Sequence, residues 1–146
     1  MRDALRRFDR DEDGQVLVLV AIFMMGLIAV AGLVADSGLM LAQRRDLQNI
    51  ADAAAAAGAM RIDETAYRAS GGSVVVLDTA AASQTAIEYL MGEDGVQYAV
   101  DATTSGVEVD VARSAHTAFL RLLGIDGLDI RARAAAEPRS GIAGGP

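Results

Sequence analysis

The 146-residue sequence contains no cysteine, no tryptophan and no lysine, and its only histidine is His116. Without cysteine the chain has no disulfide, no thiolate nucleophile and no cysteine-ligated metal site. Ser70 and Ser73, near Gly71 and Gly72, resemble a nucleophile elbow only in composition, and a histidine elsewhere in the chain does not complete a triad with them. A single histidine forms no histidine metal cluster, and the acidic turn at residues 92–95 is too short for a calcium loop. These absences predict no catalytic residue, no metal and no cofactor, so the chain is not expected to be an enzyme.

The charge balance is acidic, with a formal net charge of −7. All basic residues are arginine, and they form no basic face along the sequence. Because nucleic-acid binding relies on a positively charged surface, we expect no nucleic-acid partner. Nor does any motif indicate a small-molecule substrate.

What the sequence does contain is a long apolar run, residues 16–35, in which twenty consecutive residues carry no charge. At about 1.5 Å per helical residue this run spans roughly 30 Å, the thickness of the hydrocarbon core of a bilayer. Twelve of its residues are Val, Leu, Ile or Phe, which favour insertion. The run therefore predicts one transmembrane helix.

Three interpretations of the N-terminal segment compete. Ala29 and Ala31 fit a signal-peptidase site, but the apolar run continues to Ala35 and exceeds the about 7–15 residues usual for a cleaved signal. A prepilin leader would be cut between Gly14 and Gln15, which are the possible processing site. An uncleaved signal anchor is the interpretation that the length of the run favours.

Arginines are more numerous before the run than after it: Arg2, Arg6, Arg7 and Arg10 precede it, and Arg44 and Arg45 follow it. Positively charged residues are retained on the cytoplasmic side. This bias predicts a single-pass protein with a cytoplasmic N-terminus and an extracytoplasmic C-terminal domain. We expect Asp36, Arg44 and Arg45 to mark the outer membrane boundary, where a carboxylate costs less than in mid-membrane.

The helix is expected to continue beyond the membrane, over residues 15–60, because no proline occurs before Pro138. Apolar or small residues recur at helical spacing after Asp36, and they are Leu39, Ala42, Leu47, Ile50, Ala54 and Ala57. Four small residues at spacings of four, three and four form one stripe, and they are Ala31, Ala35, Gly38 and Ala42. Small residues let helices approach closely in lipid, so this stripe is predicted to be a helix-packing surface.

Residues 61–137 are predicted to form a small α+β extracytoplasmic domain. We expect a helix over 79–91, capped by Asp78, and alternating strands over 96–102, 107–111 and 128–134. Residues 74–77 fit a short strand or a buried connector, and residues 114–124 fit a short helix with His116 in its first turn. If the last two strands are neighbours, Glu108 and Asp110 face Arg131 and Arg133.

The predicted organisation is thus a cytoplasmic segment (1–14), a transmembrane helix with its extension (15–60), the α+β domain (61–137) and a flexible tail (138–146). The inward side chains of the 79–91 helix are expected to be Ala80, Ile87, Leu90 and Met91. The fold class is α+β and pilin-like, with a long N-terminal transmembrane helix that continues into a small antiparallel β-sheet domain. Alternating strands need one covered face, and the long helix offers small residues to cover it.

The segment from Asp13 to Ala59 resembles the N-terminal part of the TadE/TadG-like proteins of the Flp/Tad pilus-assembly family. The shared pattern is Gly14-Gln15, an apolar span ending at Asp36, an arginine pair before Leu47-Gln48, and an Ala-Asp-Ala-Ala segment at 51–54. Leu19 stands where TadE-type prepilins carry glutamate, which favours the TadG-like branch.

The resemblance implies a membrane-anchored, pilin-like accessory component, or minor pilin, of a Tad/Flp-type pilus or secretion system in the bacterial cell membrane. Its implied partners are other Tad or pilin-like membrane proteins and the lipid bilayer. The alternative function is a secreted or surface-anchored adhesive or binding domain released by signal peptidase.

Overall fold

The structure is a computed structural model that describes residues 2–124 and 127–139, with side chains at residues 14–121, 124 and 127–139. Residues 140–146 of the predicted tail lie outside the described residues. The chain divides into two compact units. The helical unit comprises Met1–Leu39 and Thr117–Asp126, and the sheet unit comprises Met40–His116 and Gly127–Pro146.

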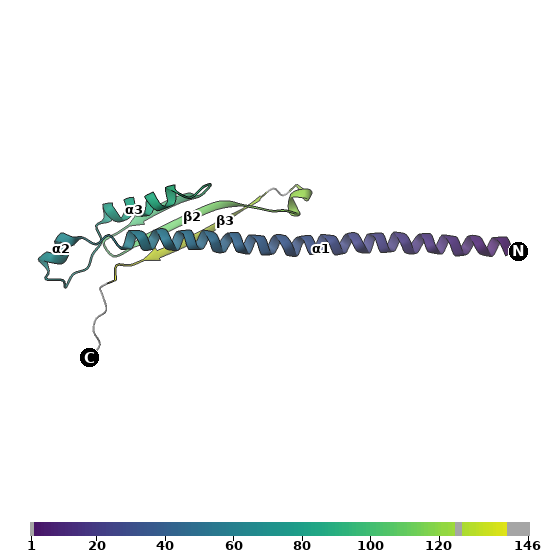
Figure 1. Ribbon diagram of the computed structural model, residues 1–146, viewed down its shortest axis with the longest axis horizontal. Coiled ribbons are helices and arrows are strands. Elements are labelled where there is room, and N and C mark those ends of the chain that lie inside the picture. The colour runs from purple at the N-terminus through teal and green to yellow at the C-terminus, as the bar shows by residue number, and fades with distance from the viewer. Residues whose placement is uncertain (1, 125–126, 140–146) are drawn as a thin grey trace, which may run out of the picture. The chain divides into compact units, whose positions relative to one another are not determined.

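Helix α1 (Arg2–Ala59) contributes to both units and is the longest element (Figure 1). It contains no proline and is rich in Ala, Leu and Arg, which have high helix propensity. The helix passes Asp36 without interruption and ends one residue before the predicted end at Met60. Its start at Arg2 lies well before the predicted start at Gln15.

The sheet unit contains a three-stranded antiparallel sheet in the order β1-β2-β3. Its strands are β1 (Gln97–Ala102), β2 (Val107–His116) and β3 (Gly127–Ala136). In the central register Val111 pairs with Tyr98 on one side and with Ala132 on the other. A long apolar helix followed by a small antiparallel sheet confirms the predicted α+β fold class.

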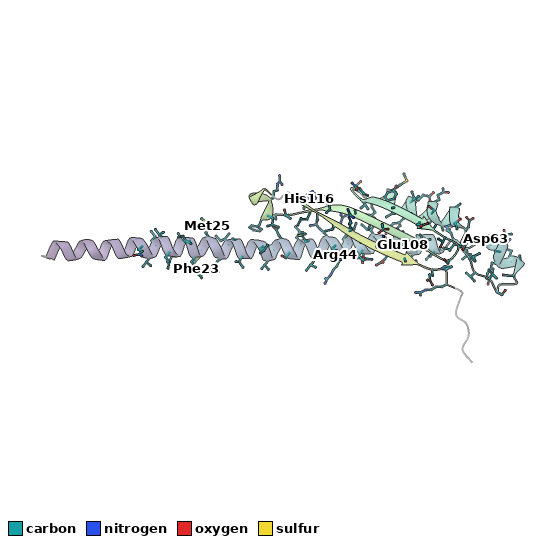
Figure 2. The ribbon with its side chains drawn as sticks, turned by 180° about the vertical axis from the view of Figure 1, so that it is seen from behind. Phe23, Met25, Arg44, Asp63, Glu108 and His116 are labelled. Atoms are coloured by element: carbon teal, nitrogen blue, oxygen red, sulfur yellow. The ribbon has the colours of Figure 1, made fainter. Side chains whose placement is uncertain are left out.

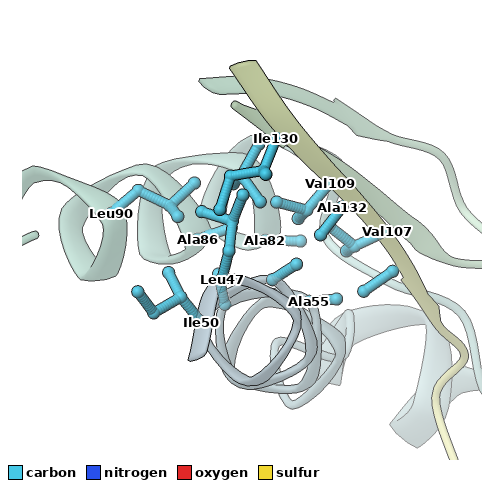
Figure 3. Close-up of a cluster of buried hydrophobic side chains, with 14 of the residues drawn as sticks. Leu47, Ile50, Ala55, Ala82, Ala86, Leu90, Val107, Val109, Ile130 and Ala132 are labelled. Carbon is cyan, nitrogen blue, oxygen red and sulfur yellow. The ribbon is translucent and has the colours of Figure 1, made fainter. Parts of the chain in front are cut away.

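The core of the sheet unit lies between one face of the sheet and two helices, the second half of α1 and α3 (Thr79–Met91) (Figure 3). The helices contribute mostly alanine, whereas the strands contribute three valines, one isoleucine and three alanines. The buried residues are Leu47, Ile50, Ala51, Ala54 and Ala55 of α1, Ala82, Ala86 and Leu90 of α3, Val107, Val109, Val111 and Ala115 of β2, Ile130, Ala132 and Ala134 of β3, and Leu77. Small helix side chains let the helix backbones lie close to the sheet.

Helix α3 has the predicted bounds and caps. The Asp78 carboxylate accepts hydrogen bonds from the backbone N–H groups of Ala80 and Ala81, at 3.1 and 3.0 Å, and Gly92 is the C-cap. The predicted inward face is partly wrong, because Ala80 and Met91 are exposed. The buried positions are Ala82, Ala86 and Leu90, whose spacing of four places them on one side of the helix, and packing against the sheet selects that side.

The predicted helix over residues 114–124 is wrong. Strand β2 continues to His116, which pairs with Gly127, and only Leu120–Leu123 form a short 3-10 helix, η1. Every residue of β2 from Val107 to His116 has a partner in β3. Tertiary pairing therefore overrides the local preference of a short, ambiguous segment.

Residues 74–77 form no named strand and are a connector. Leu77 is buried and makes an isolated bridge with Ile62. A short helix, α2 (Glu64–Ala69), precedes this connector and is capped by Asp63. The sequence pattern did not indicate α2, because a six-residue helix shows little periodicity.

The opposite face of the sheet carries charged side chains. Arg133 of β3 contacts Glu108 at 2.9 Å and Asp110 at 2.7 Å, both on β2. The hydrogen bond to Asp110 and the charges of Asp110 and Glu108 raise the pKa of Arg133. The predicted charge pairing across these strands is confirmed for Arg133, and it helps to define the register.

Gly58 marks a close approach of α1 to α3. A Cβ atom at Gly58 would lie 2.9 Å from the carbonyl oxygen of Ala82 and 3.1 Å from a methyl group of Val107. A backbone oxygen at that distance cannot move without shifting α3. The position therefore favours glycine strongly over any residue with a side chain.

We expect Gly58→Ala to lower the free energy of unfolding of the sheet unit by about 1–3 kcal/mol, because the added methyl group overpacks this contact. The measurement is chemical unfolding followed by tyrosine fluorescence, since all three tyrosines lie in the sheet unit. The matched control is Ala56→Ser, which adds one heavy atom at an exposed position on the same turn and is expected to change stability by no more than about 0.5 kcal/mol. Equal stability of the two variants would contradict the close packing.

Candidate functional site

The first half of α1 presents an apolar surface. Over most of this half, no other described element of the helical unit covers it. The large apolar side chains between Val16 and Val34 are exposed, with Phe23 at 63% and Met25 at 73% (Figure 2). By length and composition, this helix is apolar enough to cross a membrane. A water-soluble protein usually buries such a surface, so the exposed side chains suit a lipid environment.

The predicted small-residue stripe spans both units, and in neither unit does another described element cover it. Ala31, Ala35, Gly38 and Ala42 are all exposed. A Cβ atom added at Gly38 would meet no atom within 4 Å. The stripe has no partner among the described residues, and its role in helix packing stays a prediction.

Asp36 is the polar centre of the helical unit, and its side chain is only 1% exposed. One carboxylate oxygen accepts from the backbone N–H groups of Ala118 at 2.8 Å and Phe119 at 3.1 Å. The other accepts from Phe119 at 3.0 Å and Leu120 at 2.7 Å. Three consecutive N–H groups at the start of η1 are thus paired by one side chain of α1, which joins two segments more than 80 residues apart in the sequence.

Gly32 lies one turn before Asp36 on the same side of α1 and makes room for Phe119. A Cβ atom at Gly32 would come within 2.7 Å of two ring carbons of Phe119. The aromatic ring therefore rests directly on the helix backbone, within the apolar run. Asp36 and Gly32 together hold the 118–120 turn against α1 through polar and apolar contacts.

The other predicted boundary and processing residues are exposed. Arg44 and Arg45 are on the surface of the sheet unit, where Arg44 is labelled in Figure 2, and Gly14 and Gln15 are exposed on α1. Their roles at the membrane boundary and in processing stay predictions. They share no contact with Asp36 in the described structure, so the predicted site residues do not form one cluster.

Within the sheet unit, polar side chains of α1 bind the backbone of the strands. The Gln43 amide accepts from the N–H of His116 at 3.1 Å and donates to its carbonyl oxygen at 3.1 Å, and Gln48 donates to the carbonyl of Arg133 at 3.0 Å. His116 lies at the end of β2 with an exposed side chain (Figure 2). An ion pair between Asp46 and Arg113 at 2.7 Å adds a third link.

No arrangement suited to catalysis or metal binding emerges from the part of the chain that the structure describes. No group of three or more His, Asp or Glu side chains there could hold a metal ion. Two hollows on the sheet unit are open depressions lined by residues of the strands and of the turn between β1 and β2, such as Gln97, Arg131 and Ser105. The features that remain for function are the exposed surface of α1 and the turn held by Asp36.

Sequence analysis missed two contributors, the acceptor role of Asp36 and the notch at Gly32. Asp36 stood out as the first charge after the apolar run, but its partners are backbone N–H groups, which every residue except proline carries. Gly32 could have been flagged by its spacing of four from Asp36, which places both on one side of a helix.

We expect Asp36→Asn to release the 118–120 turn, because an amide offers one acceptor oxygen and places an NH2 group against a backbone donor. Amide hydrogen exchange at residues 118–120 should become at least about tenfold faster in the full chain in detergent or nanodiscs. Asp46→Asn is the matched control, since Asp46 is an exposed aspartate of the same helix that pairs with Arg113. Unchanged exchange in both variants would show that the carboxylate does not hold the turn.

A comparison with known protein families matches part of α1 and the residues that follow it. Residues 14–61 match the family described as Tad, putative Flp pilus-assembly TadE/G-like. Comparisons with curated proteins and with solved structures gave no significant match. The matched segment contains the apolar run, Gly32, Asp36, the arginine pair and the part of α1 that enters the core of the sheet unit. The match confirms that residues 14–61 resemble the TadE/G-like proteins of Flp pilus assembly.

Proposed function

We propose that the protein is a membrane-anchored, pilin-like accessory component of a Tad/Flp-type pilus or secretion system, and that it assembles through α1. The observation that carries this proposal is the exposed apolar surface of α1 inside the segment that matches the pilus-assembly family. The role is structural, and the partners are other Tad or pilin-like membrane proteins and the lipid bilayer. Residues 14–61 match an assembly family, which supports a structural rather than a catalytic role.

In this proposal residues 16–35 cross the membrane once, with the N-terminus in the cytoplasm and the sheet unit outside. The support for this orientation is the larger number of arginines before the run than after it. The polar, charged face of the sheet, with Arg133, Glu108 and Asp110, suits an aqueous compartment. Asp36, Arg44 and Arg45 then lie at or beyond the outer boundary.

Assembly is assigned to the small-residue stripe at Ala31, Ala35, Gly38 and Ala42. At 3.6 residues per turn, the centre of this stripe is rotated by roughly 110° around α1 from the side that carries Gly32 and Asp36. The covered side is therefore committed to the protein's own contacts, whereas the stripe stays open. Close approach of a second helix at small residues gains van der Waals contact that lipid does not replace.

The orientation is testable with two single-cysteine variants, because the chain has no cysteine of its own. We expect Ser73→Cys, at an exposed position of the sheet unit, to react with a membrane-impermeant maleimide in intact cells. Asp3→Cys should react only after the membrane is permeabilised. Labelling at position 3 in intact cells would contradict the orientation.

The same two variants test the alternative function. If the mature Ser73→Cys protein is labelled but the mature Asp3→Cys protein contains no cysteine at all, the N-terminal segment has been cleaved. The intact mass then identifies the cut: a start at Gln15 indicates a processed pilin, and a start at Gly32 indicates a domain released by signal peptidase. An uncleaved anchor keeps the introduced cysteine in both variants.

Assembly through the stripe is testable by replacing Ala35 and Gly38 together by leucine. Bulky side chains should hold a partner helix away, so co-purification of Tad or pilin-like components from bacterial membranes should fall several-fold while membrane insertion is retained. The matched control replaces Gly26 and Ala29 by leucine, an exposed Gly–Ala pair at the same spacing on the opposite side of α1. Equal recovery from both double variants would remove the stripe from the proposal.

A further inference from the structure

We infer that the turn at residues 118–120 is a second membrane contact, which inserts Phe119 into the boundary between acyl chains and headgroups of the outer leaflet. This inference rests on the proposed function in one respect, namely that α1 crosses the membrane with the sheet unit outside. The membrane would then hold the protein at two places: the α1 helix and a turn that lies more than 80 residues later in the sequence. Its partner is the lipid surface itself rather than another protein.

The depth of the turn follows from its contact with α1. The Phe119 ring packs on Gly32, which belongs to the uncharged run that ends at Ala35. At about 1.5 Å per residue, Gly32 lies roughly 5 Å inside the outer end of that run. An aromatic ring fixed at this level is at the depth that amphipathic and aromatic membrane anchors occupy.

The turn presents an apolar surface at that depth. Phe119 is 44% exposed despite its contact with Gly32, and Ala118 is exposed beside it. Exposed apolar side chains of α1 lie at the same level, since Leu33, the next residue after Gly32, is 54% exposed. Lipid that covers α1 at this level can therefore also reach Phe119.

The polar backbone of the turn is already satisfied, which removes the main obstacle to lipid contact. Free N–H groups are costly in an apolar environment. The N–H groups of Ala118, Phe119 and Leu120 all donate to the Asp36 carboxylate. That carboxylate is shielded in turn, since Asp36 is only 1% exposed. The Asp36 carboxylate and the three backbone N–H groups are therefore hydrogen-bonded to each other, and lipid does not need to provide partners for them.

The absence of tryptophan lets single tryptophans report depth without background. We compare Phe119→Trp, Phe23→Trp and Tyr67→Trp in the full chain reconstituted in phosphatidylcholine vesicles. The vesicles contain lipid brominated either near the headgroup or near the end of the acyl chain. Tyr67 lies in α2 and is 40% exposed, so it represents the aqueous reference.

The inference expects tryptophan at position 119 to emit at shorter wavelength than the one at position 67, and to lose most of its emission to the shallow-brominated lipid. Tryptophan at position 23 should be quenched more by the deep-brominated lipid. If position 119 behaves as position 67 and is quenched by acrylamide alone, the inference is overturned. The inference is also overturned if neither acrylamide nor either brominated lipid quenches position 119, because that result indicates that protein covers the side chain.

Failure of the anchor is distinguishable from failure of this inference. If neither lipid quenches position 23, the membrane-spanning role of α1 falls, and the lipid contact of the turn falls with it. A second probe avoids any change to the ring: a nitroxide on Ala118→Cys should collide with dissolved oxygen more often than with a water-soluble nickel complex. The reverse preference overturns the inference even if position 119 does not tolerate tryptophan.

Discussion

The Asp36 carboxylate pairs three backbone N–H groups of a segment that returns from beyond the second strand, at the point where the apolar run of α1 ends. A lone aspartate buried next to an apolar run would be costly, and three free N–H groups beside it would be costly too. Placed together, each satisfies the other. The connection between β2 and β3 is therefore held on α1, with Phe119 seated on the glycine one helical turn earlier.

Helix α1 meets different surroundings along its length, and its side chains change accordingly. Between Val16 and Val34 most of them are large and apolar, and these large side chains are exposed, which suits lipid. From Leu47 to Gly58 the buried face is mostly small, so that the backbone lies close to valines and isoleucine of the sheet (Figure 3). Large apolar side chains gain van der Waals contact with lipid. Alanines let the helix backbone come close to the larger side chains of the sheet.

The fold class was predictable from the sequence because its signals are long or strictly periodic. They are a twenty-residue uncharged run, the alternation at Val107, Val109 and Val111, and the Asp78 cap, whose partners lie within a few residues of chain. Predictions failed where the signal was short. Residues 114–116 join β2 rather than a helix because β3 offers them partners, and the inward face of α3 is offset because packing selected Ala82 and Ala86.

The sequence alone determined that the chain carries one long apolar helix, followed by a small α+β unit, and that it has no cysteine chemistry. These features were predictable because composition and periodicity reflect which side chains are buried and which face solvent or lipid. The tertiary structure decided what Asp36 and Gly32 do. Their partners are backbone N–H groups and a ring from residues 118–120, and the distance between these segments along the chain hides the pairing. The periodicity of a segment predicts which way each of its side chains faces, but only the fold brings a distant partner into contact with that side chain.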